Sequence, residues 1–542
     1  MKQKKKKKRI KKSNKFLNFQ IIILIEKIFN YKIELTMGCS HTNEESKFQR
    51  STKRRVTQSK NKDIRKNYEF ISMLGNGSFG KVRLYRDRNY KDLLFAIKTL
   101  KKEGIPPYQF NLLKSEVYIL SNLDHPNIVK YFGTFEDEYY IHIVMEYLKG
   151  HDLEKIISLK NYTGFDEKNM CQITMQLLKV LSFIHSKNII HRDIKPENIL
   201  FSNKRNFSSL KLIDFGLATF SQQDNKSVGT PFYMSPETID GISTPLSDMW
   251  SVGVIVYQMI TGKLPFETER KDNNKLLFEK IKNEDYNREH FKEVDCSEEV
   301  KDFINKTLQK EPTLRLTPQD GLNHPWILKF SSKSNESDLI NNETIQLLLD
   351  FSKKSPLQKE IYYFIAKVSN ESDIDIYKSF FNQLDCNNMG SLTLEDFKQR
   401  FENNGIEIDE EDFEEIFNGL NFHKAGKIFY SEFLAAFVSS KEFKKEEKLE
   451  SVFNLLKENE QNKNYITFES LINAVKALNL NINEKEIKKC FNELDNEIDL
   501  EDFKKLILND EKDRKSLNQE MRRHSLTKTL QYKRSMTKHK TH

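Results

Sequence analysis

The hydrophobic pattern divides the chain into a strand-rich part followed by helix-rich parts. From Tyr68, apolar residues alternate on both sides of a glycine cluster, through Leu84 and on to Leu94–Ile97, and this period of two predicts strands. Longer segments such as Cys171–His185 and Trp250–Ile260 repeat apolar residues three and four apart, which predicts helices. We therefore expect a strand-rich lobe followed by a helix-rich lobe.

Beyond Trp326 the pattern changes again. A polar stretch, Ser331–Asn342, precedes one amphipathic helix expected around Ile345–Ile365, and helix–loop–helix units follow with paired residues such as Phe380 and Phe381. The predicted fold class is α+β, with two lobes followed by an all-α domain.

The composition is that of a multidomain globular protein. The chain has 542 residues, of which 37% are hydrophobic and 31% charged, with 39 Phe and 20 Tyr. These values exclude collagen-like, mucin-like, multi-span membrane and wholly disordered chains. The five cysteines are odd in number, far apart and free of CxxC spacing, so they indicate neither a disulfide framework nor a zinc site and favour a reducing, cytosolic setting.

Charge is unevenly distributed along the chain. Residues 1–36, 37–67 and 511–542 carry net charges of +10, +6 and +7, which against a total of +9 leaves −14 for residues 68–510. The basic ends have no RNP, zinc or helix-turn-helix signature beside them, so a nucleic-acid partner is not expected. An anionic membrane surface is the expected partner of the basic N-terminal segment.

The N-terminal region contains a candidate acylation signal. The apolar run Ile21–Ile25 is too short for a transmembrane helix or a signal peptide. If Met37 is the initiator, Gly38 begins a myristoylation pattern and Cys39 lies beside it; a chance match is the alternative. We interpret residues 1–36 as a spurious or disordered basic extension and 37–67 as an acylation motif with a basic linker, and expect a cytoplasmic protein peripheral at membranes.

A glycine-rich segment, residues 75–82, lies between two predicted strands. Glycines at such a turn let backbone N–H groups approach phosphate oxygens. Sixteen residues after Val82, Lys98 lies near the end of another strand, and Glu116 lies in a helical stretch from which it could pair with Lys98. Each of these features alone is weak evidence, since an ordinary surface residue has the same appearance.

The segment His191–Asn198 supplies the remaining chemistry of phosphoryl transfer. Asp193 is a candidate base, Lys195 a cationic phosphate partner and Asn198 a metal-ligating amide, and Asp214 begins Asp-Phe-Gly 16 residues later. With this ordered set, residues 68–327 resemble the eukaryotic protein kinase family. The resemblance implies a two-lobed fold with a β-rich N-lobe, an α-rich C-lobe, and ATP with Mg²⁺ in the cleft between them.

The resemblance assigns a role to each matching residue. Asp193 would be the catalytic base, Lys195 would contact the γ-phosphate, Asn198 and Asp214 would bind Mg²⁺, and Lys98 with Glu116 would form an ion pair. The nucleotide site would comprise Leu74, Gly75, Asn76, Gly77, Ser78, Phe79, Gly80, Lys81, Val82, Ala96, Lys98, Met145, Glu146, Leu148, Asp152 and Leu200.

Other matches bear on structure and on the substrate. Ser235 departs mildly from the family's Ala-Pro-Glu, Arg315 is expected to pair with Glu237, and Asp248 is expected to brace the catalytic loop. Lys195 and the segment 229–233 resemble those of Ser/Thr kinases. Asp152 and Glu197 occupy positions that receive an arginine near the target in basophilic members, so protein substrates with basic motifs are predicted; solvated surface acids are the alternative. A pseudokinase scaffold usually lacks Lys98, Asp193 or Asp214, all of which this chain has.

Two segments of the C-terminal third fit 12-residue EF-hand loops. The first begins at Asp385 and has Met389, which offers no hard oxygen, at its fifth position. The second begins at Asn421 and has His423 and Ala425 at ligand positions. We expect at most two weak Ca²⁺ sites, with ligands from Asp385, Asn387, Ser391 and Asp396 in the first loop and from Asn421 and Glu432 in the second.

Two further units, within residues 441–510, lack competent loops. Four such units after a kinase domain resemble the calcium-dependent protein kinases over residues 38–510. The resemblance implies an autoinhibitory junction at 328–370, with Lys353-Lys354-Ser355 as a pseudosubstrate and a junction helix that the EF-hand pairs at 371–440 and 441–510 bind; an ordinary amphipathic linker helix is the alternative. Residues 511–542 are interpreted as a basic disordered tail with an autophosphorylation site at Ser525.

The predicted function is a Ser/Thr protein kinase regulated by calcium; a calcium-independent kinase with structural EF-hands is the alternative.

Overall fold

A computed structural model describes most of the chain from residue 64 to residue 508. Residues 1–63 and 509–542 lie outside the described part, and with them the predicted acylation site at Gly38 and Cys39 and the phosphorylation site at Ser525. Gly77, Ser78 and Phe79 of the glycine-rich segment also lie outside it. The described ranges are 64–76, 80–88, 93–159, 166–204, 206–220, 227–268, 274–330, 341–369, 374–403, 409–439, 446–457, 465–477, 484–493 and 497–508.

The N-terminal lobe is a five-stranded antiparallel sheet of order β1-β2-β3-β5-β4, as the alternating pattern predicts. Helix α4 (Pro107–Asn122) begins with proline in its first turn, where a missing N–H costs nothing. The register of the sheet places Lys98 of β3 opposite both Val82 of β2 and Ile143 of β5. The other elements are α3 (Ile64–Asn67), β1 (Tyr68–Asn76), β2 (Lys81–Asp87), β3 (Leu94–Lys101), β4 (Tyr131–Glu136) and β5 (Tyr140–Glu146).

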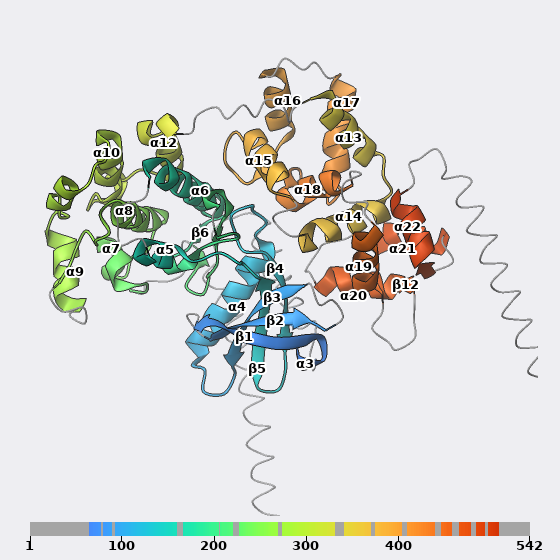
Figure 1. The fold of residues 1–542 in the computed structure, drawn as a ribbon, viewed down its shortest axis with the longest axis horizontal. Coiled ribbons are helices and arrows are strands. Elements are labelled where there is room, and N and C mark those ends of the chain that lie inside the picture. The colour runs from blue at the N-terminus through green and yellow to red at the C-terminus, as the bar shows by residue number, and fades with distance from the viewer. Residues whose placement is uncertain are drawn as a thin grey trace, which may run out of the picture. The chain divides into compact units, whose positions relative to one another are not determined.

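The second lobe is built around two buried helices, α6 (Glu167–Ser186) and α8 (Pro245–Thr261), at the two segments where the sequence predicts helices (Figure 1). Helix α8 has a capping box at Thr244 and ends at Gly262 in the left-handed conformation. The two helices carry much of the core of the lobe. Around them lie α5 (Leu153–Leu159), α7 (Pro236–Ile239), α9 (Asn274–Asn283), α10 (Glu298–Thr307), α11 (Pro318–Leu322) and α12 (Pro325–Phe330).

Short hairpins and single turns carry the residues of the predicted catalytic segments. Strands β7 and β8 pair as a hairpin, and β6 pairs with the distant β9, so the catalytic and Asp-Phe-Gly segments both lie between β6 and β9. These elements are β6 (Ile189–Ile190), η1 (Pro196–Asn198), β7 (Ile199–Phe201), η2 (Phe207–Ser209), β8 (Leu210–Leu212), β9 (Thr219–Phe220), η3 (Pro231–Tyr233), η4 (Glu289–Glu293) and η5 (Pro312–Leu314).

The prediction of a single amphipathic helix around Ile345–Ile365 is wrong, because the structure has two helices there. Helix α13 (Asn342–Ser352) ends before Pro356, and α14 (Pro356–Val368) begins a new helix. Proline in a helix interior removes a backbone hydrogen bond and disfavours helical geometry in the preceding residue. Ser355 instead accepts a hydrogen bond from the backbone N–H of Gln358 as the N-cap of α14.

The rest of the described chain forms four units, each a helix, a short strand and a helix. Strand β10 pairs with β11 and β12 pairs with β13, so the units are joined in two pairs. Their helices share one core with α13 and α14. The elements are α15 (Asp375–Leu384), β10 (Ser391–Leu392), α16 (Leu394–Asn403), α17 (Glu410–Leu420), β11 (Ile428–Phe429), α18 (Tyr430–Val438), α19 (Glu446–Leu456), β12 (Tyr465–Thr467), α20 (Phe468–Ala477), α21 (Glu484–Glu493), β13 (Glu497–Asp499) and α22 (Leu500–Leu508).

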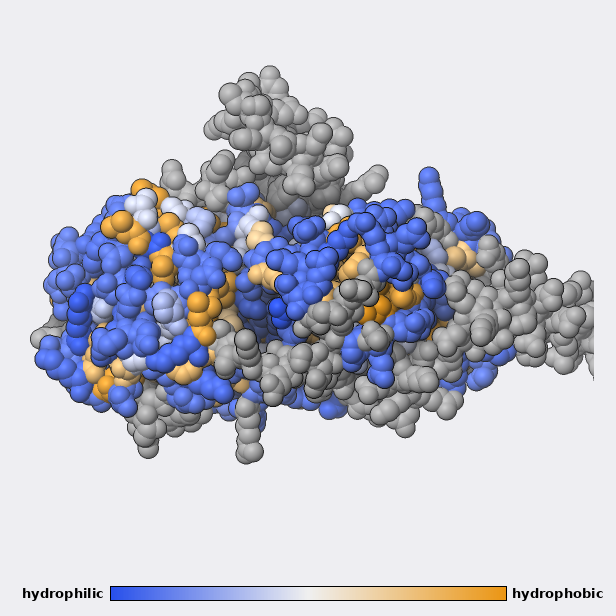
Figure 2. All heavy atoms as spheres, turned by 90° about the horizontal axis from the view of Figure 1, so that it is seen from above, coloured by the Kyte–Doolittle hydropathy of each residue, from blue (hydrophilic) through white to orange (hydrophobic). Residues whose placement is uncertain are grey.

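The surface of the described residues is largely polar. Figure 2 shows one face, on which hydrophilic residues predominate among those coloured and apolar residues form separate patches. Within the described ranges, no helix combines the length and the apolar character that crossing a bilayer requires.

Candidate active site

A buried chain of charges links the sheet, helix α4 and the Asp-Phe-Gly segment. The Nζ atom of Lys98 lies 2.6 Å from Oε1 of Glu116 and 3.0 Å from Oδ1 of Asp214. The side chains of Lys98 and Glu116 are 3% and 1% exposed. Burial acts to lower the pKa of Lys98, but the two carboxylates more than offset burial and raise it above its ordinary value. Lys98 is therefore a fixed cation beside the Asp214 carboxylate.

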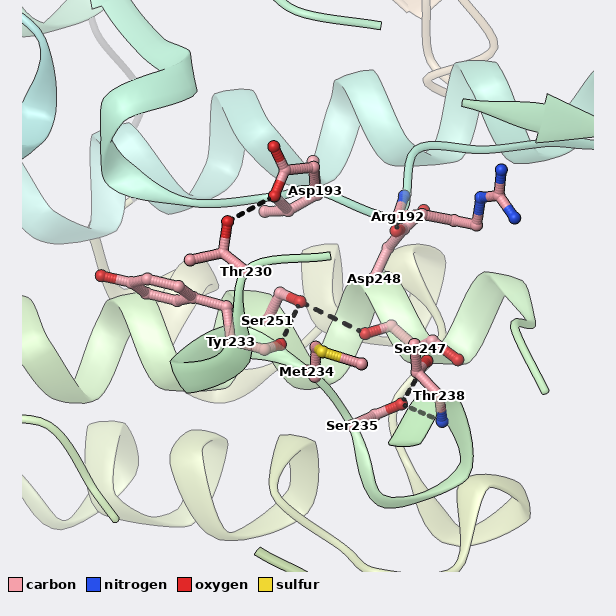
Figure 3. Close-up of a pocket in the computed structure, with 11 residues that line it drawn as sticks. Arg192, Asp193, Thr230, Tyr233, Met234, Ser235, Thr238, Ser247, Asp248 and Ser251 are labelled. Carbon is pink, nitrogen blue, oxygen red and sulfur yellow. Dashed lines mark hydrogen bonds between the residues drawn. The ribbon is translucent and has the colours of Figure 1, made fainter. Parts of the chain in front are cut away.

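The catalytic segment holds its carboxylate in a network of hydrogen bonds. Thr230 donates from its hydroxyl to Oδ1 of Asp193 at 2.7 Å (Figure 3), and Lys195 donates from Nζ to the Thr230 hydroxyl at 2.8 Å. Nζ of Lys195 also lies 2.9 Å from Oδ2 of Asp193. Asn198 donates from its amide to the same Oδ2 at 3.1 Å. A base, a cation and an amide are thus gathered at one point.

Asp248 fixes the backbone of this segment. Its carboxylate accepts hydrogen bonds from the backbone N–H groups of His191 at 3.0 Å and Arg192 at 2.9 Å, and contacts Nε2 of His185 at 2.8 Å. Burial acts to raise the pKa of Asp248, but these hydrogen bonds hold it below its ordinary value. Arg192 has a φ of 66°, a conformation that residues other than glycine adopt at a cost. The buried carboxylate compensates for that cost.

The Asp-Phe-Gly segment is anchored to the catalytic segment. The Phe215 ring packs edge-on against His191, with ring centres 4.9 Å apart, and Arg192 donates from Nε to the carbonyl of Leu217 at 2.6 Å. The backbone N–H of Gly216 donates to Oδ1 of Asp214 at 3.0 Å. These contacts hold Asp214 so that its carboxylate faces Lys98.

The predicted nucleotide-binding residues that the structure describes lie on facing strands. Ala96 of β3 lies opposite Met145 of β5, and the Met145 and Leu148 side chains are buried. A Cβ at Gly80 would collide with the carbonyl oxygen of Thr99, so only glycine fits there without rearrangement. The remaining described positions are distributed over β1 (Leu74, Gly75, Asn76), β2 (Lys81, Val82), the end of β5 and the segment after it (Glu146, Asp152), and β7 (Leu200).

The predicted substrate acids lie near the catalytic segment, together with one that the sequence analysis missed. Glu197 is exposed and Asp152 half-buried, and Oδ1 of Asp152 accepts a hydrogen bond from the backbone N–H of Lys155. Glu154 interacts electrostatically with Glu197 and accepts a hydrogen bond from Gln258 at 3.2 Å. The position of Glu154 in α5 gave no signal in the sequence that it would lie beside Glu197. The cluster is suited to a cationic side chain.

The Ser-Pro-Glu segment is held by a bidentate ion pair. Arg315 donates from two nitrogens to the two carboxylate oxygens of Glu237, at 2.6 and 2.7 Å. Burial acts to raise the pKa of Glu237, but Arg315 holds it below its ordinary value. Ser235, where the family has alanine, caps α7 by accepting from the backbone N–H of Thr238 at 3.3 Å. The departure from the family pattern therefore has a local structural use.

The first candidate calcium loop brings its predicted ligands together. Asp385 accepts hydrogen bonds from the backbone N–H groups of Met389 and Gly390, both at 2.9 Å, and burial raises its pKa to about 6. Asn387 donates from its amide to Oδ1 of Asp396 at 3.2 Å, which joins the two ends of the loop. Ser391 is buried in β10. This oxygen-rich donor set fits calcium, with fewer charged ligands than strong sites have.

In the second candidate calcium loop, a histidine lies where the first loop has an asparagine. His423 lies with Nδ1 2.8 Å from Oε1 of Glu432 and with Nε2 3.4 Å from Oε1 of Glu360, which belongs to α14. Burial acts to lower the pKa of His423, but the two carboxylates raise it to about 9. Asn421 accepts a hydrogen bond from the backbone N–H of Ala425 at 2.8 Å. Across the described part of the chain, no group of three or more His, Cys, Asp or Glu side chains is arranged to hold a metal ion.

The segment predicted as a pseudosubstrate lies between α13 and α14. Nζ of Lys354 lies over the ring of Tyr362, 5.6 Å from its centre, and the Ser355 hydroxyl interacts with the Gln358 side chain and backbone. Lys353 is the C-cap of α13. The structure therefore uses the segment as a boundary between two helices.

The sequence is similar to that of known protein kinases. The family model of the protein kinase domain matches residues 68–327. Calcium-dependent protein kinase 14 of Arabidopsis thaliana is 33% identical over 358 residues, which cover 65% of this chain and 66% of that protein. Calcium-dependent protein kinase 3 of Plasmodium berghei is 32% identical, over 62% of this chain and 60% of the relative. Calcium-dependent protein kinase 8 of Oryza sativa is 34% identical, over 62% of each. Each match spans less than two thirds of the relative's length.

Proposed function

We propose that this chain is a protein kinase of the calcium-dependent kind that it resembles in sequence, and that it transfers the γ-phosphate of ATP to serine or threonine hydroxyls of proteins. The observation that carries the proposal is the gathering of Lys195, Asn198 and the Thr230 hydroxyl around the Asp193 carboxylate. A carboxylate within hydrogen-bond reach of a hydroxyl beside a fixed cation is what hydroxyl activation next to a phosphate requires.

The chain's own residues divide the work of the transfer. Asp193 accepts the proton of the substrate hydroxyl, and Lys195 offers positive charge to the γ-phosphate. Lys98, held by Glu116, contacts the inner phosphates, and the oxygens of Asn198 and Asp214 are suited to hold Mg²⁺. Bound Mg²⁺ would neutralise phosphate charge.

We propose that the substrates carry a basic residue near the target hydroxyl. Glu197 and Glu154, which lie close enough to interact electrostatically, and Asp152, two residues before Glu154, supply the carboxylates of this cluster. An arginine side chain would neutralise this cluster and position the hydroxyl at Asp193. Replacing the arginine three residues before the target with alanine in a peptide should lower kcat/KM, and Glu197→Gln should remove most of that preference.

We propose that the four helix–strand–helix units form an EF-hand domain that binds the junction helix α14 and controls the kinase. The paired strands between loops and the shared core with α14 support this assignment. Gln358 donates to the carbonyl of Leu506 at 2.7 Å and Tyr362 to that of Ile507 at 2.8 Å, so α14 also contacts the last unit. The first loop would supply Asp385, Asn387, Asp396 and the Ser391 carbonyl to Ca²⁺.

We also propose that the form starting at Met37 is acylated at Gly38 and lies peripherally at cytoplasmic membranes. The motif and the basic segment after it support this, since one acyl chain needs a second signal such as Cys39 or basic residues. Gly38→Ala should release that form from anionic vesicles, whereas an unchanged membrane fraction would contradict the proposal.

The decisive experiment is single-turnover phosphate transfer by the full chain, with excess calcium and with a calcium chelator. Asp193→Asn should abolish measurable transfer while ATP binding persists, because the base acts on the hydroxyl and not on the nucleotide. Comparable turnover by the variant would contradict the catalytic assignment. Equal turnover with calcium and with chelator would leave a kinase without calcium control.

A further inference from the structure

The second loop has a histidine where an EF-hand loop needs an oxygen ligand at its third position. His423 extends into the loop and lies between two carboxylates, with Nδ1 2.8 Å from Glu432 and Nε2 3.4 Å from Glu360. Glu432 is the twelfth residue of the loop and is 1% exposed, and Glu360 lies on α14 and is 6% exposed. The imidazole therefore joins the loop to a different element.

With this side chain in place, the rest of the loop offers few oxygen ligands to calcium. Calcium takes six to eight oxygen ligands. Ala425 at the fifth position offers none from its side chain, and the Asn421 oxygen accepts from the backbone N–H of Ala425. The second Glu432 oxygen accepts from the backbone N–H of Phe429 at 2.8 Å. One oxygen of the carboxylate most important for a metal is thus held by the imidazole itself, whereas the third position of the first loop is Asn387, whose amide has an oxygen to offer.

The histidine is also confined by aromatic rings. The Tyr363 ring of α14 packs edge-on against the imidazole, with centres 4.9 Å apart, and Phe422 lies 4.4 Å away. The neighbouring part of α14, Leu357–Ala366, is buried throughout. Glu360 and Tyr363 both come from α14. His423 therefore contacts this helix through an ion pair and through an aromatic ring at the same place.

We infer that His423 takes the place of a metal ion in the second loop and fastens the junction helix α14 to it without calcium. The imidazole bridges Glu432 and Glu360 in the way a bound cation would join the loop's carboxylates. This inference rests on the proposed EF-hand domain and deepens it: calcium acts through the first loop alone, while the attachment of α14 to the second loop is constant.

The test is hydrogen exchange of the full chain in a calcium chelator. His423→Ala leaves the buried Glu432 without its hydrogen bond and the buried Glu360 without its ion-pair partner, so amides of Leu357–Ala366 should exchange about tenfold faster or more. Asn387→Ala is the matched control at the third position of the first loop, because Asn387 bonds only within its own loop. It should leave exchange of α14 within about twofold of the unaltered chain.

A second variant keeps the test valid if His423→Ala fails to fold. His423→Gln retains an N–H donor for Glu432 but has no second ring nitrogen for Glu360, so α14 should still exchange faster. Unchanged α14 exchange in both folded variants would overturn the inference.

Calcium stoichiometry provides an independent arm. In calorimetry of the Asp385→Ala chain, adding Glu432→Gln should leave the calcium isotherm unchanged, because the second loop contributes no site. A calcium site that persists in the single variant and disappears in the double variant would overturn the inference. Neither arm measures phosphate transfer, so failure here is distinguishable from failure of the proposed kinase activity.

Discussion

The hydroxyl of Thr230 donates a 2.7 Å hydrogen bond to the carboxylate of Asp193, across 37 residues of sequence. The same hydroxyl accepts from Lys195, so one threonine positions both the candidate base and the candidate phosphate ligand. Thr230 touches no bond that changes in the reaction that we propose. It is a positioning residue, and it occupies the place beside Asp193 where a substrate hydroxyl must come close.

Thr230→Ala should lower kcat by about 10- to 100-fold, since a hydrogen bond to a charged group contributes about 1.5–3 kcal/mol. The KM for ATP should change little, because the lost contact lies on the hydroxyl side of the site. Thr230→Ser should recover most of the activity, which a merely steric role of the methyl group would not predict. Steady-state kinetics on a basic peptide measures the kcat of both variants and their KM for ATP. Full activity of the alanine variant would exclude the positioning role.

Glu116→Gln should lower kcat/KM for ATP by about tenfold or more, because the buried Lys98 loses its charge-assisted partner. The matched control is Glu103→Gln. Glu103 pairs with Lys101 on the same strand, but the two side chains are 80% and 58% exposed, so solvent already screens the pair. Equal losses in the two variants would show that burial of the Lys98 pair is irrelevant to nucleotide use.

Glu237→Gln should destabilise the kinase domain in a way that depends on pH. Removing one partner of a buried ion pair costs about 3–5 kcal/mol. The pKa of Glu237 is below its ordinary value in the folded state, so its contribution is present at neutral pH and is lost as pH falls through the folded pKa. The urea midpoint of the variant should therefore fall at pH 7 and converge with that of the unaltered chain in acid.

The control for this measurement is Glu289→Gln, which breaks an exposed pair with Lys292. Its urea midpoint should match that of the unaltered chain throughout the pH range. A gap between Glu237→Gln and the unaltered chain that persists undiminished below the pKa of a free carboxyl group would contradict the assigned cause.

Asp396→Glu should tighten calcium binding in the first loop by about tenfold. The added methylene gives the twelfth position the reach for bidentate binding, which the shorter side chain lacks while it is bound to Asn387 and Thr393. Calorimetry should find the unaltered chain weaker than sensor sites of about 10⁻⁷ to 10⁻⁵ M. No gain in the variant would mean that the missing ligand at Met389, and not this reach, limits the site.

Local patterns in the sequence determined much of this protein. Asp193, Lys195 and Asn198 are predictable because they lie within one short segment, and the sheet and helices α6 and α8 follow from periodicity that depends only on neighbouring residues. The pairing of Arg315 with Glu237 followed from the family resemblance. The break at Pro356 was also available in the sequence, as a helix-breaking residue inside a helical pattern.

Only the tertiary structure decided which distant side chains meet. Thr230 reaches Asp193, and His423 reaches Glu360, because separate elements pack together and bring polar atoms to within hydrogen-bond or ion-pair distance. Spacing along the chain carries no information about such contacts, since it reports which face of a helix or strand a residue occupies but not what covers that face. The sequence therefore identified a histidine in a candidate EF-hand loop, and the fold showed that a glutamate from another helix lies at ion-pair distance from it.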